Sequence, residues 1–392
     1  MKLLEFQAHE LLARFGIPCS SGCVVTTVAE LAARAAEVSY PIVVKAQVQT
    51  GGRGKAGGVR IAASAAELIA QGGEILAMRF GGQAPAALFL TGKKDISQEL
   101  YLSIVMDRRG KQPVVILSRE GGVDINEAAR RDAGKVAKLG IDPAAGVQPY
   151  SLQYLFDRAG IDGELGGSLG PIVENLYALF REYDCLLAEI NPLALEKSGA
   201  LTALDAKIEV DDNSLYRHPD VVAWREAMCS DPLVKKARGF HFLYIPVEAE
   251  GNIGVISNGS GMIMSSMDML SRHGRKVACA LDLGGGATAD RISEAVRIVL
   301  SNPSVRLVFV NIFGGITRCE EVAGGIVRAS AESPTGQFVV RMEGTNKEKG
   351  LAICRESPQG IRLVDGLEGA MVAIADAFAD AGGQAPGKDG RR

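Results

Sequence analysis

Apolar residues in the first 240 or so positions follow two spacings, which predict a mixture of helices and strands. Between Glu5 and Phe15 they recur every three or four residues, as on one side of a helix, and Gly16-Ile17-Pro18 ends it. Strands 100–106 and 114–117 are expected to pair antiparallel. Further helices are predicted over 29–37, 65–78 and 169–183, and further strands over 185–191 and 201–210.

After Asn252, apolar strand-like runs alternate regularly with helix-like segments. The runs begin at Ile253, Val277, Val305, Phe338 and Ile361. Apolar runs separated by helices predict a parallel, doubly wound sheet that is buried on both faces. The loops after the first four strands contain Asn258-Gly-Ser-Gly261, Gly284-Gly-Gly286, Gly314-Gly315 and Glu343-Gly344. Ligands bind at this edge in such folds, although glycines there are also ordinary turn residues.

This change of rhythm predicts two α/β domains. A chain of 392 residues is long enough for two or three domains. We expect the first domain over residues 1–238 and the second over 239–381. The segment 382–392 is rich in glycine and charged residues, which predicts a disordered tail.

Composition and charge narrow the possible partners. The chain is 47% hydrophobic, and its net charge of −3 gives no electrostatic reason to expect nucleic acid or an anionic membrane as partner. Its seven cysteines form no Cys-x-x-Cys pair, which fits a reducing compartment. No run approaches the roughly 18 apolar residues of a membrane span. The start, Met-Lys-Leu-Leu-Glu, reads as neither a signal nor a transit peptide, so we expect a cytoplasmic protein.

A glycine-rich segment, Gly51-Gly-Arg-Gly-Lys-Ala-Gly-Gly58, lies between strand-like runs 41–48 and 59–62. Glycine lets the backbone approach a ligand closely, and free N–H groups beside Arg53 and Lys55 can form an anion site. The segment lacks the Gly-x-x-x-x-Gly-Lys-Ser/Thr order of a P-loop. Strand, loop and strand predict a flap over phosphates. By itself the segment is equally well interpreted as a flexible hairpin with solvated cations.

A hairpin later in the chain offers oxygen ligands for a metal. If the strands on either side of Ser198 pair, Asn191 faces Asp205. In the same register Glu189 faces Lys207, and all four side chains lie on one face of the sheet. Magnesium takes one or two oxygens from protein and the rest from phosphates and water, which suits Asn191 and Asp205. The alternative for the hairpin alone is a solvent-facing polar stripe.

Together these segments resemble the β subunit of succinyl-CoA synthetase (succinate–CoA ligase), from Glu5-Phe-Gln-Ala8 to about residue 380. The motifs are Gly51–Gly58, Glu99-Leu-Tyr-Leu102, Glu120-Gly-Gly-Val-Asp124, Glu189-Ile-Asn-Pro192, Gly284-Gly-Gly-Ala-Thr288 and Asn311-Ile-Phe-Gly-Gly-Ile-Thr-Arg318. The resemblance implies an ATP-grasp domain followed by a flavodoxin-like domain. It also implies an acid–thiol ligase of the citric acid cycle that works as a heteromer with a separate α subunit.

The resemblance implies roles for single residues. Nucleotide contacts are expected from Lys45, Gly52, Arg53, Gly54, Thr91, Lys94 and Glu99. Asn191 and Asp205 would hold Mg²⁺. The succinate carboxylate would lie near Asn258, Gly315, Ile316 and Thr317, where backbone N–H groups suit an anion. Glu189 matches a glutamate that faces a phosphohistidine.

That histidine is expected on the α subunit, which would also make most contacts to CoA. The histidines here, His9, His218, His241 and His273, are interpreted as surface or packing residues. In the implied reaction, succinate, CoA and ATP or GTP give succinyl-CoA, phosphate and ADP or GDP. The phosphoryl group passes from the nucleotide to the histidine and then to succinate, and the CoA thiolate then displaces phosphate from succinate. Mg²⁺ and the cations of the chain would offset the charge of the transferring phosphoryl group. The chain alone is expected to be inactive.

One position departs from the family pattern. Thr91 stands where the family usually has a glutamate near the ribose and base, and a hydroxyl cannot accept two ribose hydrogen bonds as a carboxylate can. The choice between adenine and guanine is therefore open.

Three other functions share parts of this pattern. A malate–CoA ligase has the same architecture, and a non-catalytic CoA- or nucleotide-binding regulator could use the same fold. The presence of Lys45, Asn191 and Asp205 argues against the regulator. The C-terminal domain argues against a stand-alone ATP-grasp carboxylate–amine ligase.

Overall fold

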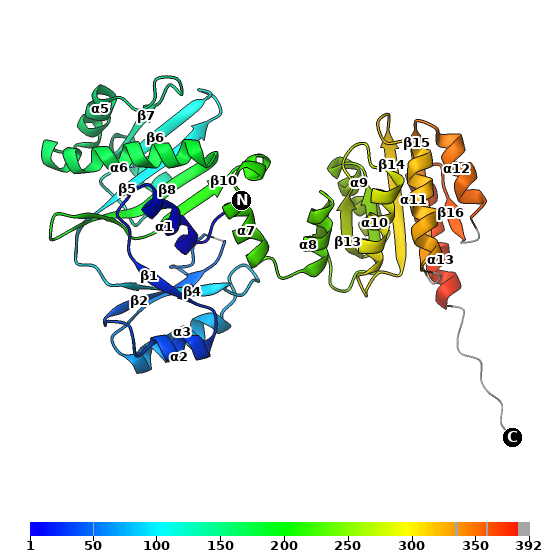
Figure 1. The fold of residues 1–392 in the computed structure, drawn as a ribbon, viewed down its shortest axis with the longest axis horizontal. Coiled ribbons are helices and arrows are strands. Elements are labelled where there is room, and N and C mark those ends of the chain that lie inside the picture. The colour runs from blue at the N-terminus through cyan, green and yellow to red at the C-terminus, as the bar shows by residue number, and fades with distance from the viewer. Residues whose placement is uncertain (50, 334–335, 358–359, 383–392) are drawn as a thin grey trace. The chain divides into compact units, whose positions relative to one another are not determined.

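The computed structural model describes residues 1–49, 51–333, 336–357 and 360–382, and it divides the chain into two compact units, Met1–Met228 and Cys229–Arg392 (Figure 1). The tail expected over 382–392 lies, apart from Gly382, outside the described residues. The division precedes helix α8 (Pro232–Gly239), which packs on strand β11 (Leu243–Pro246) of the second unit. The boundary expected from the sequence, 238/239, falls at the end of that helix.

The first unit contains two antiparallel sheets. The smaller has the order β1 (Gly22–Val25), β4 (Ala87–Gly92), β2 (Ile42–Gln47) and β3 (Val59–Ala62). Helices α2 (Val28–Arg34) and α3 (Ala65–Ala77) pack together on one of its faces (Figure 1). Leu31, Leu68 and Ile75 are fully buried in the core between them. Each helix begins after a capping hydroxyl, Thr27 for α2 and Ser64 for α3.

The larger sheet has the order β10 (Ala206–Val210), β8 (Cys185–Glu196), β5 (Ile96–Asp107), β6 (Gln112–Ser118) and β7 (Val136–Gly140), and β9 (Leu201–Ala203) also pairs with β8. The pair expected over 100–106 and 114–117 is confirmed as β5 and β6. Helices α1 (Glu5–Arg14), α5 (Pro149–Ala159) and α6 (Gly163–Glu182) pack against this sheet. The other elements of the unit are α4 (Ile125–Arg131), η1 (Ala133–Lys135), η2 (Asp212–Arg217) and α7 (Pro219–Met228).

The strand expected over 201–210 is wrong in one respect, because it is interrupted at residues 204–205. Strand β9 pairs with residues 193–195 of β8, and β10 pairs with residues 185–190. Pro192 lies between these stretches and has no N–H to donate to the ladder. The interruption leaves Asp205 at the point where the two short strands meet.

The second unit has one sheet in the order β11, β13 (Val277–Asp282), β12 (Ile253–Ser257), β14 (Leu307–Gly314), β15 (Gln337–Gly344) and β16 (Ile361–Leu363). Strands β12 to β16 are parallel, so the predicted doubly wound sheet is confirmed. Strand β11 was not predicted. It is an antiparallel edge strand that ends at Pro246, a residue that sheets tolerate at their edges.

Helices cover both faces of this sheet (Figure 1). The core on one face takes residues from α10 (Ala289–Leu300), α11 (Cys319–Ala331) and α12 (Lys347–Arg355). The core on the other face takes residues from α9 (Ser260–Arg272) and α13 (Leu367–Gly382). Burial on both faces explains why the strands read as continuous apolar runs.

The end of β15 requires glycine. Gly344 has φ +120°, and a Cβ at this position would lie 2.0 Å from the carbonyl oxygen of Gly314 on the neighbouring strand. We predict that Gly344→Ala lowers the free energy of unfolding by at least about 2 kcal/mol, through strain and steric overlap. Chemical denaturation followed by circular dichroism measures the change. Gly366→Ala is the control, because a Cβ at Gly366 would meet nothing within 4 Å. Equal midpoints for the two variants would contradict the steric argument.

Candidate functional site

A cavity of about 300 Å³ in the first unit brings together the glycine-rich segment and the predicted metal-ligand hairpin. The predicted residues that line it are Gly52, Arg53, Gly54, Glu189, Asn191 and Asp205. The other lining residues are Lys2, Leu3, Glu5, Val48, Gln49, Gly51, Val59, Ala206 and Lys207. Segments far apart in the sequence therefore share one polar cavity.

The register of β8 and β10 places the polar side chains of the hairpin as predicted. Lys207 pairs with Glu189, and the backbone N–H of Asn191 donates to the carbonyl oxygen of Asp205 at 3.0 Å. All four side chains border the cavity, which confirms the predicted common face. The alternative of a polar stripe facing only solvent does not describe this arrangement.

The glycine-rich segment connects two antiparallel strands, β2 and β3, as predicted. Its turn is closed by a hydrogen bond from the N–H of Gly58 to the carbonyl oxygen of Arg53 at 2.8 Å. Gly52 has φ +82°, a backbone conformation that favours glycine. The Arg53 guanidinium turns back to the strand and donates to the carbonyl oxygen of Ala46 at 2.9 Å.

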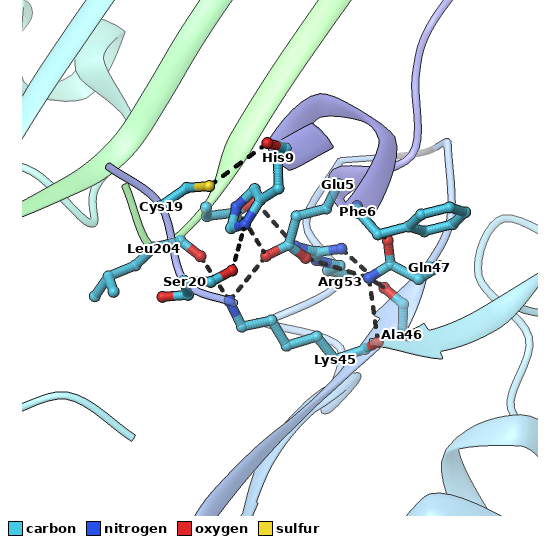
Figure 2. A network of polar contacts seen from close by, with 11 residues as sticks. Glu5, Phe6, His9, Cys19, Ser20, Lys45, Ala46, Gln47, Arg53 and Leu204 are labelled. Carbon is cyan, nitrogen blue, oxygen red and sulfur yellow. Dashed lines mark hydrogen bonds and ion pairs between the residues drawn. The ribbon is translucent and has the colours of Figure 1, made fainter. Parts of the chain in front are cut away.

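The buried carboxylate of Glu5, on α1, pairs with two cations, Lys45 and Arg53 (Figure 2). The Glu5 side chain is 2% exposed and forms ion pairs with Lys45, at 2.8 Å, and with Arg53. Gln47 donates to the same carboxylate at 3.2 Å, and Lys45 also donates to the carbonyl oxygen of Leu204 at 2.6 Å. Lys45 does not line the cavity itself but lies behind it, fixed through Glu5.

The series of ion pairs extends to Asp205, one of the two predicted metal ligands. Arg53 contacts Asp205 Oδ1 at 3.0 Å, so charges alternate along Asp205, Arg53, Glu5 and Lys45. Burial opposes ionisation of Glu5, but Lys45 and Arg53 lower its pKa below the usual range. Partial desolvation and the neighbouring Glu5 carboxylate raise the pKa of Asp205, whose side chain is nevertheless 44% exposed. The two carboxylates thus compete for the same cations, and Glu5 holds the stronger position.

The loop Glu120–Asp124 holds the other predicted metal ligand. Gly122 N–H donates to Asn191 Oδ1 at 2.7 Å, and Asn191 Nδ2 donates to the carbonyl oxygen of Val123 at 3.1 Å. Glu99 lies against this loop, since a Cβ on Gly122 would come within 2.2 Å of its carboxylate oxygen Oε2. Glu99 therefore belongs to the same assembly as Asn191, although it does not line the cavity.

Glu189 receives a hydrogen bond from a buried tyrosine. Tyr101 is 3% exposed and its hydroxyl donates to Glu189 Oε2 at 3.0 Å. Burial and the Glu189 carboxylate raise the pKa of Tyr101 well above its usual range, so this phenol stays a neutral donor. The hydrogen bond joins the Glu99–Leu102 and Glu189–Pro192 motifs across neighbouring strands β5 and β8.

Thr91 and Lys94 lie away from the lining of the cavity. Thr91 is 2% exposed within β4, where it pairs with Val43 of β2. Lys94 forms an ion pair with Glu196 at 3.0 Å, and Thr202 also donates to Glu196, at 2.7 Å. The geometry of this cavity therefore assigns no nucleotide contact to either side chain.

The predicted carboxylate site of the second unit forms at the carboxyl ends of β12 and β14. Asn258 exchanges two hydrogen bonds with the backbone of Phe313, at 2.9 and 3.1 Å. Thr317 is 1% exposed and accepts from the N–H of Gly286 at 3.3 Å, while Ile316 is 80% exposed. Thr345 donates to the carbonyl oxygen of Gly315 at 2.9 Å. The four predicted residues thus share one edge of the sheet.

Sequence reasoning missed Glu5 and Tyr101, although both lie in motifs that it singled out. The signal for Glu5 was an acidic residue in line with Ala8 and Leu12, on the apolar side of a helix. Such a side chain is buried only with partners. Its partners come from strand β2 and the glycine-rich segment, which helical spacing does not reveal. For Tyr101 no comparable signal existed, because tyrosine is common in strands.

The oxygen ligands fit a metal that is shared with phosphate. Among the described residues no cluster of three or more His, Cys, Asp or Glu side chains could hold a metal ion. Asn191 and Asp205 supply one amide and one carboxylate, which matches an ion that completes its shell with phosphate and water.

In the part of the chain that the structure describes, every helix is too short or too polar to cross a bilayer.

Two family models match the chain, an ATP-grasp domain over residues 2–195 and a CoA-ligase over residues 256–368. The ADP-forming succinate–CoA ligase β subunit of Rubrobacter xylanophilus is 42% identical over 363 residues, which cover 92% of this chain and 94% of that protein. The GDP-forming β subunit of Thermus thermophilus is also 42% identical, over 359 residues that cover 91% of this chain and 94% of that protein.

Among solved structures, ATP citrate lyase from Methanothrix soehngenii, in complex with citrate and coenzyme A, has the same fold. Its TM-score is 0.74 at 18% identity, and the match covers 97% of this chain and 99% of that chain. At this identity the likeness concerns the fold alone.

Loss of the Glu5 carboxylate should destabilise the chain. We predict that Glu5→Ala lowers the free energy of unfolding by about 3–5 kcal/mol, because it leaves the buried cations Lys45 and Arg53 without their shared counter-ion. Glu10→Ala on the same helix is the control: its pair with Arg14 is half exposed, and its loss should cost about 0–1 kcal/mol. Chemical denaturation gives both values. If Glu5→Ala lowers the free energy of unfolding no more than Glu10→Ala does, Glu5 is not the required counter-ion.

Proposed function

The chain belongs to the β subunits of succinate–CoA ligase, ADP- or GDP-forming enzymes of the citric acid cycle, and we propose that the first-unit cavity is its phosphoryl-transfer site. The observation that carries the proposal is the shared cavity of the glycine-rich segment, Asn191 and Asp205. A nucleotide and CoA are substrates of this ATP-grasp ligase family. The two relatives named above are succinate–CoA ligases, which favours this activity over a malate–CoA ligase and over a non-catalytic regulator.

The glycine-rich segment binds the nucleotide phosphates in this proposal. Backbone N–H groups around Gly52 and Gly54 approach the phosphate oxygens, and Arg53 adds positive charge at the cavity wall. Lys45 contributes its charge from behind the wall, where Glu5 holds it. Preorganised cations of this kind stabilise charge on a transferring phosphoryl group without reorganisation.

Asn191 and Asp205 are the proposed magnesium ligands. Mg²⁺, when bound, would neutralise charge on the nucleotide phosphates. The protein's own contribution is to position the two ligand oxygens. The Glu120–Asp124 loop positions Asn191, and Arg53 positions Asp205. Glu99 supports Asn191 through its contact with Gly122.

The nucleophile is proposed to come from the partner. The name β subunit, which the relatives carry, implies an α subunit. None of the four histidines of the chain lines the described cavity. His9 is 3% exposed and bonds to the carbonyl oxygen of Ser20, and His218 pairs with Asp184. Glu189, at the wall of the cavity, is the residue we propose to face a phosphohistidine of the α subunit.

The second unit is proposed to bind the succinate carboxylate, with most contacts to CoA made by the α subunit. Asn258 holds Phe313 and thereby presents Gly314 and Gly315 at the strand ends. Loop N–H groups there can receive an anion. Phe313 and Ile316 are 59% and 80% exposed, an apolar rim that suits coverage by a partner subunit. We place the protein in the cytoplasm, in line with its seven free cysteines.

The choice between ATP and GTP depends on the residues near the base of the nucleotide. ADP-forming and GDP-forming relatives are 42% identical to the chain alike, so identity does not separate the two. Thr91 lies within its strand and Lys94 pairs with Glu196. We propose these two positions, together with Glu99, as contributors to nucleotide binding on the basis of the family pattern.

Reconstitution tests the divided site. We predict that the chain alone does not turn over succinate, CoA and nucleotide, and that addition of a matching α subunit restores succinyl-CoA formation. Assays with ATP and GTP, each with succinate or malate, also identify the preferred substrates. Turnover by the chain without the α subunit would rule out a histidine supplied by the partner.

Removal of the proposed metal ligand gives a second test. We predict that Asp205→Ala abolishes magnesium-dependent phosphorylation of the α-subunit histidine, because an alanine supplies no ligand oxygen. The measurement is transfer of labelled γ-phosphate to the α subunit as Mg²⁺ is varied. Asp157→Ala, on the exposed side of α5, should leave transfer unchanged. Normal transfer in the Asp205→Ala variant would remove Asp205 from the metal site.

A further inference from the structure

The hydrogen bond between Tyr101 and Glu189 stands out among the contacts around the cavity. Glu189 lines the cavity, and its side chain faces it from β8. Tyr101 lies on the neighbouring strand β5, two residues from Ser103, which pairs directly with Glu189. Diagonal neighbours of this kind are within reach of a long aromatic side chain. The tyrosine hydroxyl donates to Glu189 Oε2 at 3.0 Å.

Burial leaves the side chain of Tyr101 little conformational freedom. Tyr101 is 3% exposed, so the surrounding core fixes its ring and with it the position of the hydroxyl. Lys207 pairs with Glu189 in the backbone register, yet among the ion pairs of the described residues none joins these two side chains. The Tyr101 hydroxyl is therefore the hydrogen-bond donor that the structure gives to this carboxylate.

The other carboxylate oxygen of Glu189, Oε1, has different surroundings. No hydrogen bond to Glu189 Oε1 occurs within the described part of the chain. A carboxylate with one oxygen bound and the other open at a cavity wall has a defined direction. Its free oxygen can meet a donor that arrives from outside the unit, such as the ring N–H of a histidine.

We propose that Tyr101 is a positioning residue for phosphoryl transfer: it binds Glu189 Oε2 and directs Oε1 towards the histidine of the α subunit. This inference rests on the proposed role of Glu189. Tyr101 itself contacts neither nucleotide nor histidine. A purely structural tyrosine, whose hydroxyl only finds a partner inside the protein, would affect stability and not the rate of transfer.

Tyr101→Phe tests the proposal, because it removes one hydroxyl and keeps the ring. The variant is assembled with the α subunit, and phosphorylation of the α-subunit histidine is followed by rapid quench. The rate should fall by about 10- to 100-fold, the range expected for loss of a hydrogen bond to a charged group. The dissociation constant of the nucleotide, from calorimetry, and its KM should stay unchanged. An unchanged rate, or a loss explained by weaker nucleotide binding, overturns the proposal.

Tyr177→Phe is the matched control. Tyr177 is 5% exposed, and its hydroxyl is buried without a hydrogen-bond partner in the structure. Removal of this hydroxyl should leave both the transfer rate and the nucleotide affinity at wild-type values. A fall equal to that of Tyr101→Phe would mean that any buried hydroxyl of this unit matters, and the specific role of Tyr101 would be lost.

Glu189→Gln separates failure of the inference from failure of the proposed function. If Tyr101 acts through Glu189, Tyr101→Phe should cause no further loss of rate in the Glu189→Gln background. Additive losses would mean that Tyr101 acts independently and would overturn the inference alone. A Glu189→Gln variant with a normal rate would overturn the role of Glu189, and the inference with it.

Discussion

The buried carboxylate of Glu5 is the constraint on which the proposed phosphate-binding end of the cavity depends. Lys45 and Arg53 are both largely buried, and two unpaired positive charges in the interior would be costly. Glu5 supplies the counter-charge from α1, and it is the one residue of this helix that lines the described cavity. The ion pair with Lys45 also attaches the N-terminal helix to strand β2 of the smaller sheet, so one buried contact both stabilises the fold and positions these cations.

The proposed site combines residues on paired strands with a glycine-rich turn. Glu189 and Asn191 lie on β8, which has paired strands on both sides, and Asp205 lies between β9 and β10, where its carbonyl oxygen accepts from the N–H of Asn191. The proposed phosphate-binding groups lie on a glycine-rich turn, where backbone N–H groups can approach a ligand closely. Each proposed site residue is bound by a neighbour: Tyr101 donates to Glu189, the backbone of the Glu120–Asp124 loop donates to Asn191, and Arg53 donates to Asp205.

Much of the fold could be predicted from the sequence. Helix α1, the β5–β6 pair and the parallel sheet of the second unit follow from apolar spacing and turn residues, since these signals are local. The interruption between β9 and β10 and the edge strand β11 could not be predicted. The first depends on Pro192 in a partner strand, and the second is too short to display a period. The hairpin register was predictable because side chains alternate with period 2, and the pairing confirms it.

By itself, the sequence determined the residue types at the site, the order of the motifs and the facing pairs of the hairpin. Each of these depends on local periodicity or on residues adjacent in the chain. Only the tertiary structure decided that Glu5 binds Lys45 and Arg53, that Tyr101 binds Glu189, and that Thr91 lies inside a strand. These contacts join residues dozens of positions apart. The chain can bury such charges only where folding brings opposite partners together, and that condition is set by packing in three dimensions.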